Sequence, residues 1–181
     1  MMGEFPCGTL DALKARFVDA PHAGATAPLF VICDRIQDAY NFGAILRCCD
    51  AMKVDSVIIG ERSQASITPH VARSSAGAVN YQSIFRVREL TAAVDVLKSS
   101  GVMVVAATEK ASTTLWEANL RQPVAFVIGT ESTGIAPELL SMCDLQVSIP
   151  MLGRVNSLNA AVAAGIVLCE CRRQQATAAG R

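Results

Sequence analysis

The sequence predicts an α/β fold in which helices cover both faces of a parallel sheet, giving three layers, α/β/α. Two observations lead to this prediction. Apolar runs of strand length alternate with helix-like segments along most of the 181 residues, as they do in βαβ units. The runs are also continuously apolar, which is typical of strands that are buried on both faces.

The predicted strands are short apolar runs, of which Pro28–Asp34 (PLFVICD) is the clearest. A run of this length and composition is typical of a strand in the middle of a sheet. The predicted strands cover Pro28–Asp34, Val57–Ile59, Ile84–Val87, Val102–Ala107, Val124–Ile128 and Leu145–Ile149.

Capping residues mark the beginnings of several predicted helices, because Ser, Thr and Asn side chains can accept hydrogen bonds from the free N–H groups of a first turn. Proline is also tolerated at the first helical position. The predicted helices are Leu10–Ala20 after Thr9, Phe42–Met52 after Asn41, one beginning at Thr68-Pro69, Leu90–Lys98, Ala136–Met142, and one that begins after Ser157 and ends near Arg173.

We expect one compact domain with short additions at both ends. Residues 1–27 comprise the N-terminal helix and a linker, because Pro21–Ala27 is small and contains proline and glycine. Residues 28–173 form the α/β domain, which is long enough to bury a real core. Residues 174–181 are small and polar, so we expect a flexible tail.

The composition is poor in charge. Charged residues make up 18% of the chain and the mean hydropathy is +0.35, which indicates a deeply buried sheet or a sizeable subunit interface. Sixteen basic residues balance sixteen acidic ones, so any RNA site must be a local patch. Arg35, Arg62, Arg73 and Arg154 are candidates for such a patch, with ordinary surface arginines as the alternative.

No apolar run approaches the roughly 18 residues that span a bilayer, and the first residues lack the basic-then-apolar layout of a signal peptide. We therefore expect a cytoplasmic protein that does not enter a membrane. The seven cysteines contain no C-x-x-C matched by a second pair of ligands. We expect them to be reduced thiols that fill apolar space, and we expect no metal site.

Glycine and polar residues gather in predicted loops that follow strands. These loops are Arg35–Arg47, Gly129–Gly134 and Pro150–Asn159. Ligands of open parallel sheets bind outside the carboxyl ends of the strands, so we expect the loops to converge on one pocket. Glycines at 129, 134 and 153 allow close backbone approach or positive φ, and helix N-termini favour an anionic group.

The glycine pattern does not match a dinucleotide or triphosphate site. G-x-E-x-x-G is neither the Rossmann G-x-G-x-x-G nor a P-loop, and H-E-x-x-H and G-x-S-x-G are absent. A different nucleotide-using α/β enzyme is therefore the least favoured interpretation.

Taken together, the loops resemble the motifs of the SpoU/TrmH family of RNA 2′-O-ribose methyltransferases, in the SPOUT superfamily. The first motif, N-x-G-x-x-x-R, is matched by Asn41, Gly43 and Arg47. The second, G-x-E-x-x-G, is matched by Gly129, Glu131 and Gly134. The third, I-P-M-x-G-x-x-x-S-L-N, is matched by Ile149, Pro150, Met151, Gly153, Ser157, Leu158 and Asn159. The resemblance covers roughly Leu29 to Glu170.

The resemblance implies a sheet whose C-terminal segment passes through a preceding loop to form a trefoil knot. It also implies S-adenosyl-L-methionine as the methyl donor, RNA as the substrate, and a homodimer. The residues implied to contact the donor are Thr108, Gly129, Gly134, Ile149 and Leu158. Those implied to serve catalysis are Asn41, Arg47, Glu131, Ser157 and Asn159.

We therefore expect an S-adenosylmethionine-dependent methyltransferase that modifies a ribose 2′-hydroxyl in structured RNA. Ribosomal RNA is favoured over transfer RNA, because the chain lacks obvious basic extensions that would grip a tRNA body. Family proposals make Arg47 the general base, but a guanidinium is effectively always protonated in proteins, so a grip on an RNA phosphate is the easier role. The alternative is a non-catalytic RNA-binding or ribosome-assembly module that retains the fold.

Overall fold

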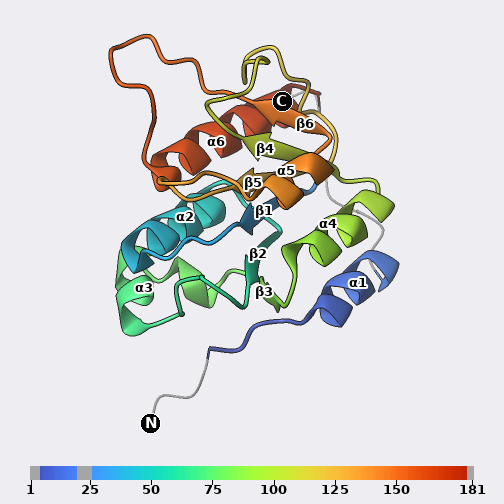
Figure 1. Ribbon diagram of the computed structural model, residues 1–181. Coiled ribbons are helices and arrows are strands. Elements are labelled where there is room, and N and C mark those ends of the chain that lie inside the picture. The colour runs from blue at the N-terminus through green and yellow to red at the C-terminus, as the bar shows by residue number, and fades with distance from the viewer. Residues whose placement is uncertain (1–4, 20–25, 179–181) are drawn as a thin grey trace.

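A parallel sheet forms the centre of the computed structural model, which describes residues 5–19 and 26–178 (Figure 1). Its strands are β1 (Leu29–Cys33), β2 (Ser56–Gly60), β3 (Ile84–Val87), β4 (Met103–Ala107), β5 (Val124–Ile128) and β6 (Leu145–Val147). They lie in the order β3-β2-β1-β5-β4-β6, and all neighbours are parallel. The predicted parallel sheet is confirmed.

Helices cover both faces of the sheet, which confirms the three layers (Figure 1). One face carries α2 (Ala39–Ala51), α3 (Pro69–Ser74) and α6 (Ala160–Ala178). The other face carries α1 (Leu10–Asp19), α4 (Leu90–Ser99) and α5 (Pro137–Met142). A short 3-10 helix, η1 (Ala78–Asn80), was not predicted.

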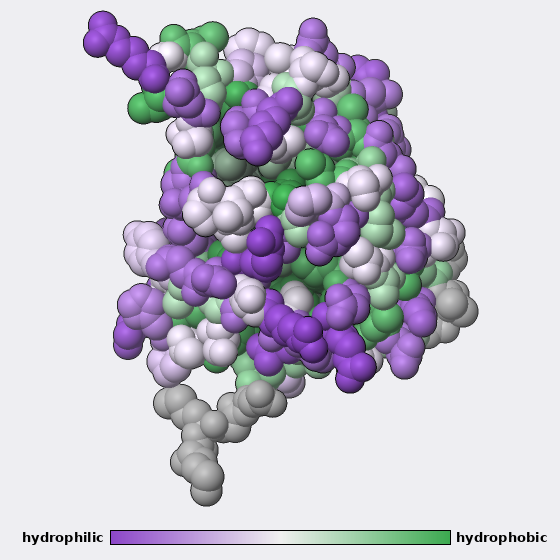
Figure 2. All heavy atoms as spheres, in the orientation of Figure 1, coloured by the Kyte–Doolittle hydropathy of each residue, from purple (hydrophilic) through white to green (hydrophobic). Residues whose placement is uncertain are grey.

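The core has two halves, one on each face of the sheet. Within β1, Leu29 and Val31 point into one half while Phe30 and Ile32 point into the other, and all four side chains are buried. This is the two-sided burial that the continuous apolar runs predict. The face drawn in Figure 2 shows apolar surface gathered in a central hollow among polar residues.

The helices that follow neighbouring strands change faces at the boundary between β1 and β5. The two strands are neighbours, yet the helices that follow them, α2 and α5, lie on opposite faces. This boundary is the switch point of the sheet, and ligands of open α/β sheets bind near such a point, outside the carboxyl ends of the strands.

Two helices begin at caps that differ from the predicted ones. The carboxylate of Asp38, and not Asn41, accepts the capping hydrogen bond of α2, from the Asn41 N–H at 2.7 Å. At α6 the cap is Asn159 rather than Ser157, because the Asn159 Oδ1 accepts bonds from the N–H groups of Ala161 and Val162. Thr9 caps α1 as predicted, with its Oγ1 3.3 Å from the Ala12 nitrogen.

The segment before β1 packs against the α/β domain. Gly8 pairs with the edge strand β3 through two backbone bonds, and α1 packs against α4 and β3. Of the predicted linker Pro21–Ala27, residues 21–25 lie outside the described residues.

The C-terminal helix does not end near Arg173 but continues to Ala178. Gln174 and Gln175 were assigned to a flexible tail, and both are buried. The Gln174 side chain makes two hydrogen bonds to the backbone of the segment between β4 and β5. Its Oε1 accepts from the Leu120 N–H, and its Nε2 donates to the Ala118 carbonyl. These bonds satisfy the buried amide and hold the last turns in place.

The predicted strand Leu145–Ile149 is also shorter, because β6 ends at Val147. Beyond it the Ser148 N–H donates to the Thr113 carbonyl, and the Leu115 N–H donates to the Ser148 carbonyl. Ser148 thus pairs with the segment that links β4 to β5 and leaves the sheet.

Arg172 fastens α6 to the rest of the domain. Its guanidinium donates to the carbonyls of Met52, Lys53 and Ala27 and to Gln175 Oε1. Replacing Arg172 with Met leaves the part-buried carbonyls of Met52 and Ala27 and the buried Gln175 side chain without this partner, so we expect a loss of about 2–3 kcal/mol of unfolding free energy in urea titrations.

The matched control is Arg173→Met, one residue along the same helix. The Arg173 side chain is exposed and pairs with Glu170 at the surface, so we expect a change below about 1 kcal/mol. Equal losses for both variants would contradict the anchoring role of Arg172.

Candidate functional site

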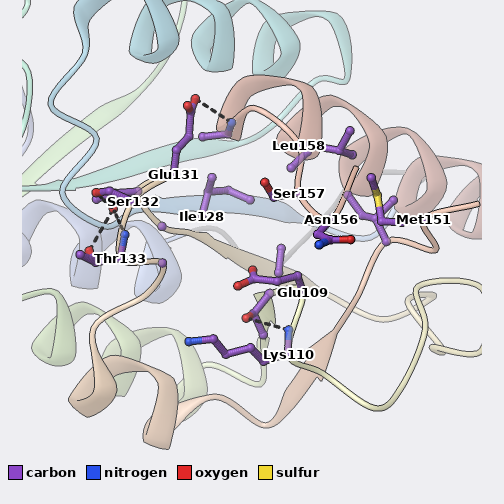
Figure 3. A pocket seen from close by; sticks show the side chains of 18 residues that line it. Glu109, Lys110, Ile128, Glu131, Ser132, Thr133, Met151, Asn156, Ser157 and Leu158 are labelled. Atoms are coloured by element: carbon purple, nitrogen blue, oxygen red, sulfur yellow. Dashed lines mark hydrogen bonds between the residues drawn. The ribbon is translucent and has the colours of Figure 1, made fainter. Parts of the chain in front are cut away.

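A pocket lies at the carboxyl ends of β4, β5 and β6 (Figure 3). Its walls are the residues that follow each of these strands, together with the first turns of α6. The lining residues are Ala107–Lys110, Ile128–Gly134, Ile149, Met151, Asn156, Ser157, Leu158, Ala160 and Ala163. This is the position at which a parallel sheet is expected to bind a ligand.

The loop after β5 is a tight turn that requires its two glycines. Gly134 has φ 68°, which disfavours other residues, and its carbonyl accepts a bond from the Thr130 N–H. A Cβ on Gly129 would lie 2.4 Å from the Gly134 carbonyl carbon and 2.5 Å from the Ile135 nitrogen. Gly129 is therefore required first by the loop's own backbone, and not by a ligand as the sequence suggested.

A hydrogen-bond network joins this loop to two helices. Glu131 Oε1 accepts bonds from Asn41 Nδ2 at 2.9 Å, from Asn159 Nδ2 at 2.6 Å and from the Ala160 N–H at 3.2 Å. Asn159 Nδ2 also donates to Asn41 Oδ1 at 2.8 Å. Residues from all three motifs thus meet at one carboxylate, which Figure 3 shows directed toward the start of α6.

The local structure explains why these side chains are free to meet. Because Asp38 caps α2, the Asn41 side chain is not used as a cap and reaches Glu131 instead. Asn159 caps α6 with its oxygen and binds Glu131 with its nitrogen. Glu131 sits at the N-terminus of α6, where the helix dipole favours a negative charge.

The residues predicted to contact a donor all line the pocket: Thr108, Gly129, Gly134, Ile149 and Leu158. Of the residues implied in catalysis, Glu131 and Ser157 line the pocket, and Asn41 and Asn159 bind Glu131. The second and third loops therefore share one cavity, and the first loop does not line it but bonds to the second loop through Arg35 and Asn41.

Arg47 stands apart from the pocket. It is exposed on α2, almost two turns beyond Asn41, and it is not among the lining residues. In the described part of the chain its side chain has no hydrogen bond or ion pair. Its guanidinium is free to bind an outside partner.

Gly43, the remaining residue of the first motif, is a packing residue. A Cβ at this position would lie 1.8 Å from Ser74 Oγ and 2.9 Å from the Ser75 nitrogen. The glycine therefore allows α2 and α3 to pack closely, and it has no direct part in the pocket.

Sequence reasoning missed several pocket residues. Glu109 and Lys110 follow β4 directly and approach the pocket from the side opposite Glu131 (Figure 3). The rule that ligands bind at strand ends, applied at this strand only to Thr108, would have found both. Asn156 lies in the predicted loop Pro150–Asn159, although no role was assigned to it individually.

The four arginines that were candidates for an RNA-binding patch differ in their availability. Arg62, Arg73 and Arg154 are exposed. Arg35 is not free, because its guanidinium binds Asp34 at 3.0 Å through two nitrogens and donates to the Gly134 carbonyl.

The buried cysteines have little tendency to ionise. Burial raises the pKa of Cys33 and of Cys171 to about 12, which suits thiols that fill apolar space. Among residues 5–19 and 26–178, no group of three or more His, Cys, Asp or Glu side chains is placed to hold a metal ion. None of the helices described is both long and apolar enough to span a membrane.

Comparison with known proteins relates most of the chain to one family. The model of the SpoU rRNA Methylase family matches residues 28–169. A TrmH family protein of Staphylococcus saprophyticus is 38% identical over 145 residues, which cover 80% of this chain and 58% of that protein. The chain thus spans a little over half the length of this curated relative.

Several solved structures have the same fold as this chain. The SpoU methyltransferase AviRb from Streptomyces viridochromogenes superposes with a TM-score of 0.83 at 28% identity, over 96% of this chain and 66% of that one. The same enzyme has been solved in complex with the cofactor AdoMet, with a TM-score of 0.77, 30% identity, and coverage of 84% and 59%. An RNA 2′-O ribose methyltransferase has a TM-score of 0.74 at 31% identity, with coverage of 87% and 60%.

Gly129 and Gly153, one in each of the loops after β5 and β6, should differ in how well they tolerate replacement by alanine. In Gly129→Ala the new methyl group meets the Gly134–Ile135 backbone, so we expect a loss of about 1–3 kcal/mol of unfolding free energy. Gly153→Ala is the control, because a Cβ there meets open space, and we expect no loss and a gain of up to about 1 kcal/mol. Urea titration of both variants measures the difference, and equal effects would show that the turn is more open than described.

Proposed function

Since the chain belongs to the SpoU rRNA Methylase family, we propose that it transfers a methyl group from S-adenosylmethionine to a ribose 2′-hydroxyl of structured RNA. The observation that carries the proposal is the single pocket into which the second and third motif loops both open. The name of one structural relative, an RNA 2′-O ribose methyltransferase, supports the choice of the ribose hydroxyl.

The lining of the pocket fits this donor. Ile149, Met151 and Leu158 offer apolar surface for an adenine ring, while the hydroxyls of Thr108 and Ser157 can bind its polar groups. The AdoMet complex of AviRb supports the assignment. We assign donor binding and catalysis to the domain that begins near residue 28, matching the extent of the family model.

S-adenosylmethionine, when bound, supplies a methyl group on a positively charged sulfonium. The methyl–sulfur bond breaks as the bond to the ribose oxygen forms, and the hydroxyl gives up its proton. A carboxylate beside the sulfonium would stabilise a charge that disappears in the transition state. Glu131 avoids this, because its Oε1 is held by Asn41, Asn159 and the start of α6.

Arg47 binds the RNA in this proposal. Its exposed guanidinium has no partner among the described side chains, and a guanidinium is the natural bidentate ligand of a phosphate. Because a guanidinium is a poor proton acceptor, we assign Arg47 to fixing the RNA backbone, and the proton of the hydroxyl leaves through that phosphate or water.

Ribosomal RNA is the proposed substrate, in keeping with the description of the family, and the cytoplasm is the proposed location. We also propose that the chain is knotted. The path supports this, because β6 lies at the sheet edge and α6 returns to pack beside α2. Ser148, directly after β6, bonds to Thr113 and Leu115 in the segment between β4 and β5, and Gln174 near the end of α6 bonds to Leu120 of the same segment.

We further propose that the enzyme works as a homodimer formed through a face of α2 and α6. Trp116 and Tyr40 are 66% and 65% exposed there, and Val162 is 50% exposed. Together with Ile166 they line one groove next to Asn41 and Asn159. Contiguous exposed apolar surface of this kind marks protein interfaces.

Arg47→Ala should abolish methyl transfer while donor affinity stays nearly unchanged, because Arg47 lies outside the pocket. Methylation of rRNA with labelled donor measures the first, and calorimetric titration with S-adenosylmethionine measures the second. The control is Arg121→Ala, an exposed arginine that precedes β5 at the opposite end of the strand.

Retention of most activity in Arg47→Ala would remove this residue from the reaction. Absence of saturable donor binding in the wild-type chain at sub-millimolar donor would overturn the enzyme proposal. It would favour the non-catalytic RNA-binding or ribosome-assembly module instead.

The dimer face has its own test. Val162→Glu places a charge in the proposed interface, and we expect sedimentation at the 19.1 kDa mass of one chain where the wild type sediments at twice that mass. Tyr81→Glu is the control, because Tyr81 is 81% exposed and lies outside the groove. A wild-type chain that sediments as a monomer would refute the dimer.

A further inference from the structure

A buried acidic side chain lies where β1 ends. Asp34 is 3% exposed, and its Oδ2 accepts a hydrogen bond from the Ala136 N–H at 2.7 Å. The Asp34 N–H donates to the Ile128 carbonyl at 2.8 Å. Asp34 thus ties the end of β1 to both ends of the loop that follows β5.

Arg35 extends this connection into the loop itself. Its Nε and Nη2 each bind one Asp34 oxygen at 3.0 Å, a bidentate pairing that fixes the plane of the guanidinium. Nη2 also donates to the Gly134 carbonyl at 3.1 Å, and Nη1 lies 3.5 Å from Thr133 Oγ1. The Gly134 carbonyl is the same group that closes the turn with the Thr130 N–H.

The backbone at Arg35 is strained. Its φ is 57°, in the left-handed region that residues other than glycine, Asn and Asp seldom occupy. Strain of this kind persists where the surroundings impose it, and it is concentrated at functional sites. Glycine would suit this backbone better. What arginine adds is the guanidinium that reaches Thr133 and Gly134.

We infer that Asp34 and Arg35 form a positioning clamp that holds the loop 129–136 in the shape that binds the methyl donor. The inference rests on the proposed function, because this loop is a wall of the proposed donor pocket. Neither residue lines the pocket, so both act through the loop. Asn41 and Asn159 hold the loop at Glu131, and the clamp holds it at Thr133 and Gly134.

Arg35→Gly removes the guanidinium of the clamp. The change relieves the strained φ but leaves the buried Asp34 carboxylate without its bidentate partner, so we expect a lower melting temperature without donor. The Kd for S-adenosylmethionine, measured by calorimetric titration, should increase about tenfold or more, as expected for the loss of hydrogen bonds from a charged group. Asp34→Asn, which removes the bidentate partner, should raise the Kd in the same direction.

Ser63→Gly is the matched control. Ser63 has nearly the same φ, 55°, and is exposed outside the pocket. The substitution relieves the same kind of strain, and the donor Kd should stay within about twofold of the wild type.

The outcomes separate the two proposals. If the wild type binds donor and Arg35→Gly binds it equally well, the clamp is overturned and the proposed function stands. A lower melting temperature in Arg35→Gly with unchanged Kd would assign a purely structural role and also overturn the clamp. If the wild type does not bind donor, both proposals fail.

Discussion

One carboxylate holds together parts of the molecule that are distant in the chain. Glu131 Oε1 receives N–H groups from Asn41 on α2, from Asn159 before α6 and from Ala160 in its first turn. Because Glu131 belongs to the loop after β5, these bonds fasten that loop to two helices on one face of the sheet. The partial positive charge at the start of α6 favours the carboxylate in this position.

The order of the strands determines why the loop needs this support. β1 and β5 are neighbours while α2 and α5 lie on opposite faces, so the loop after β5 lies between helices of the two faces. Glu131 secures it on the side of α2, and Asp34 with Arg35 secures it on the side of α5. Its remaining surface faces the residues that follow β4 and β6.

The sheet could be predicted because burial on both faces leaves a local signature, the continuous apolar run. The pocket followed from the motif resemblance together with the rule that ligands bind at strand ends, which placed Thr108 and Ile149 correctly in its lining. The helix caps could not be predicted in the same way. Asp38 and Asn41 are both good capping residues, and only the distant Glu131 decides that Asn41 is used elsewhere. Gln174 looks like a solvent-exposed residue because the backbone groups that it binds, at Ala118 and Leu120, are remote in sequence.

The central claim is that the loops after β4, β5 and β6 bind one methyl donor together. Amide hydrogen exchange, followed with and without S-adenosylmethionine, tests it most directly. The account predicts that the donor slows amide hydrogen exchange in all three segments together, in residues 108–110, 129–134 and 149–158. Protection confined to one of these segments, or found only elsewhere in the chain, would contradict it.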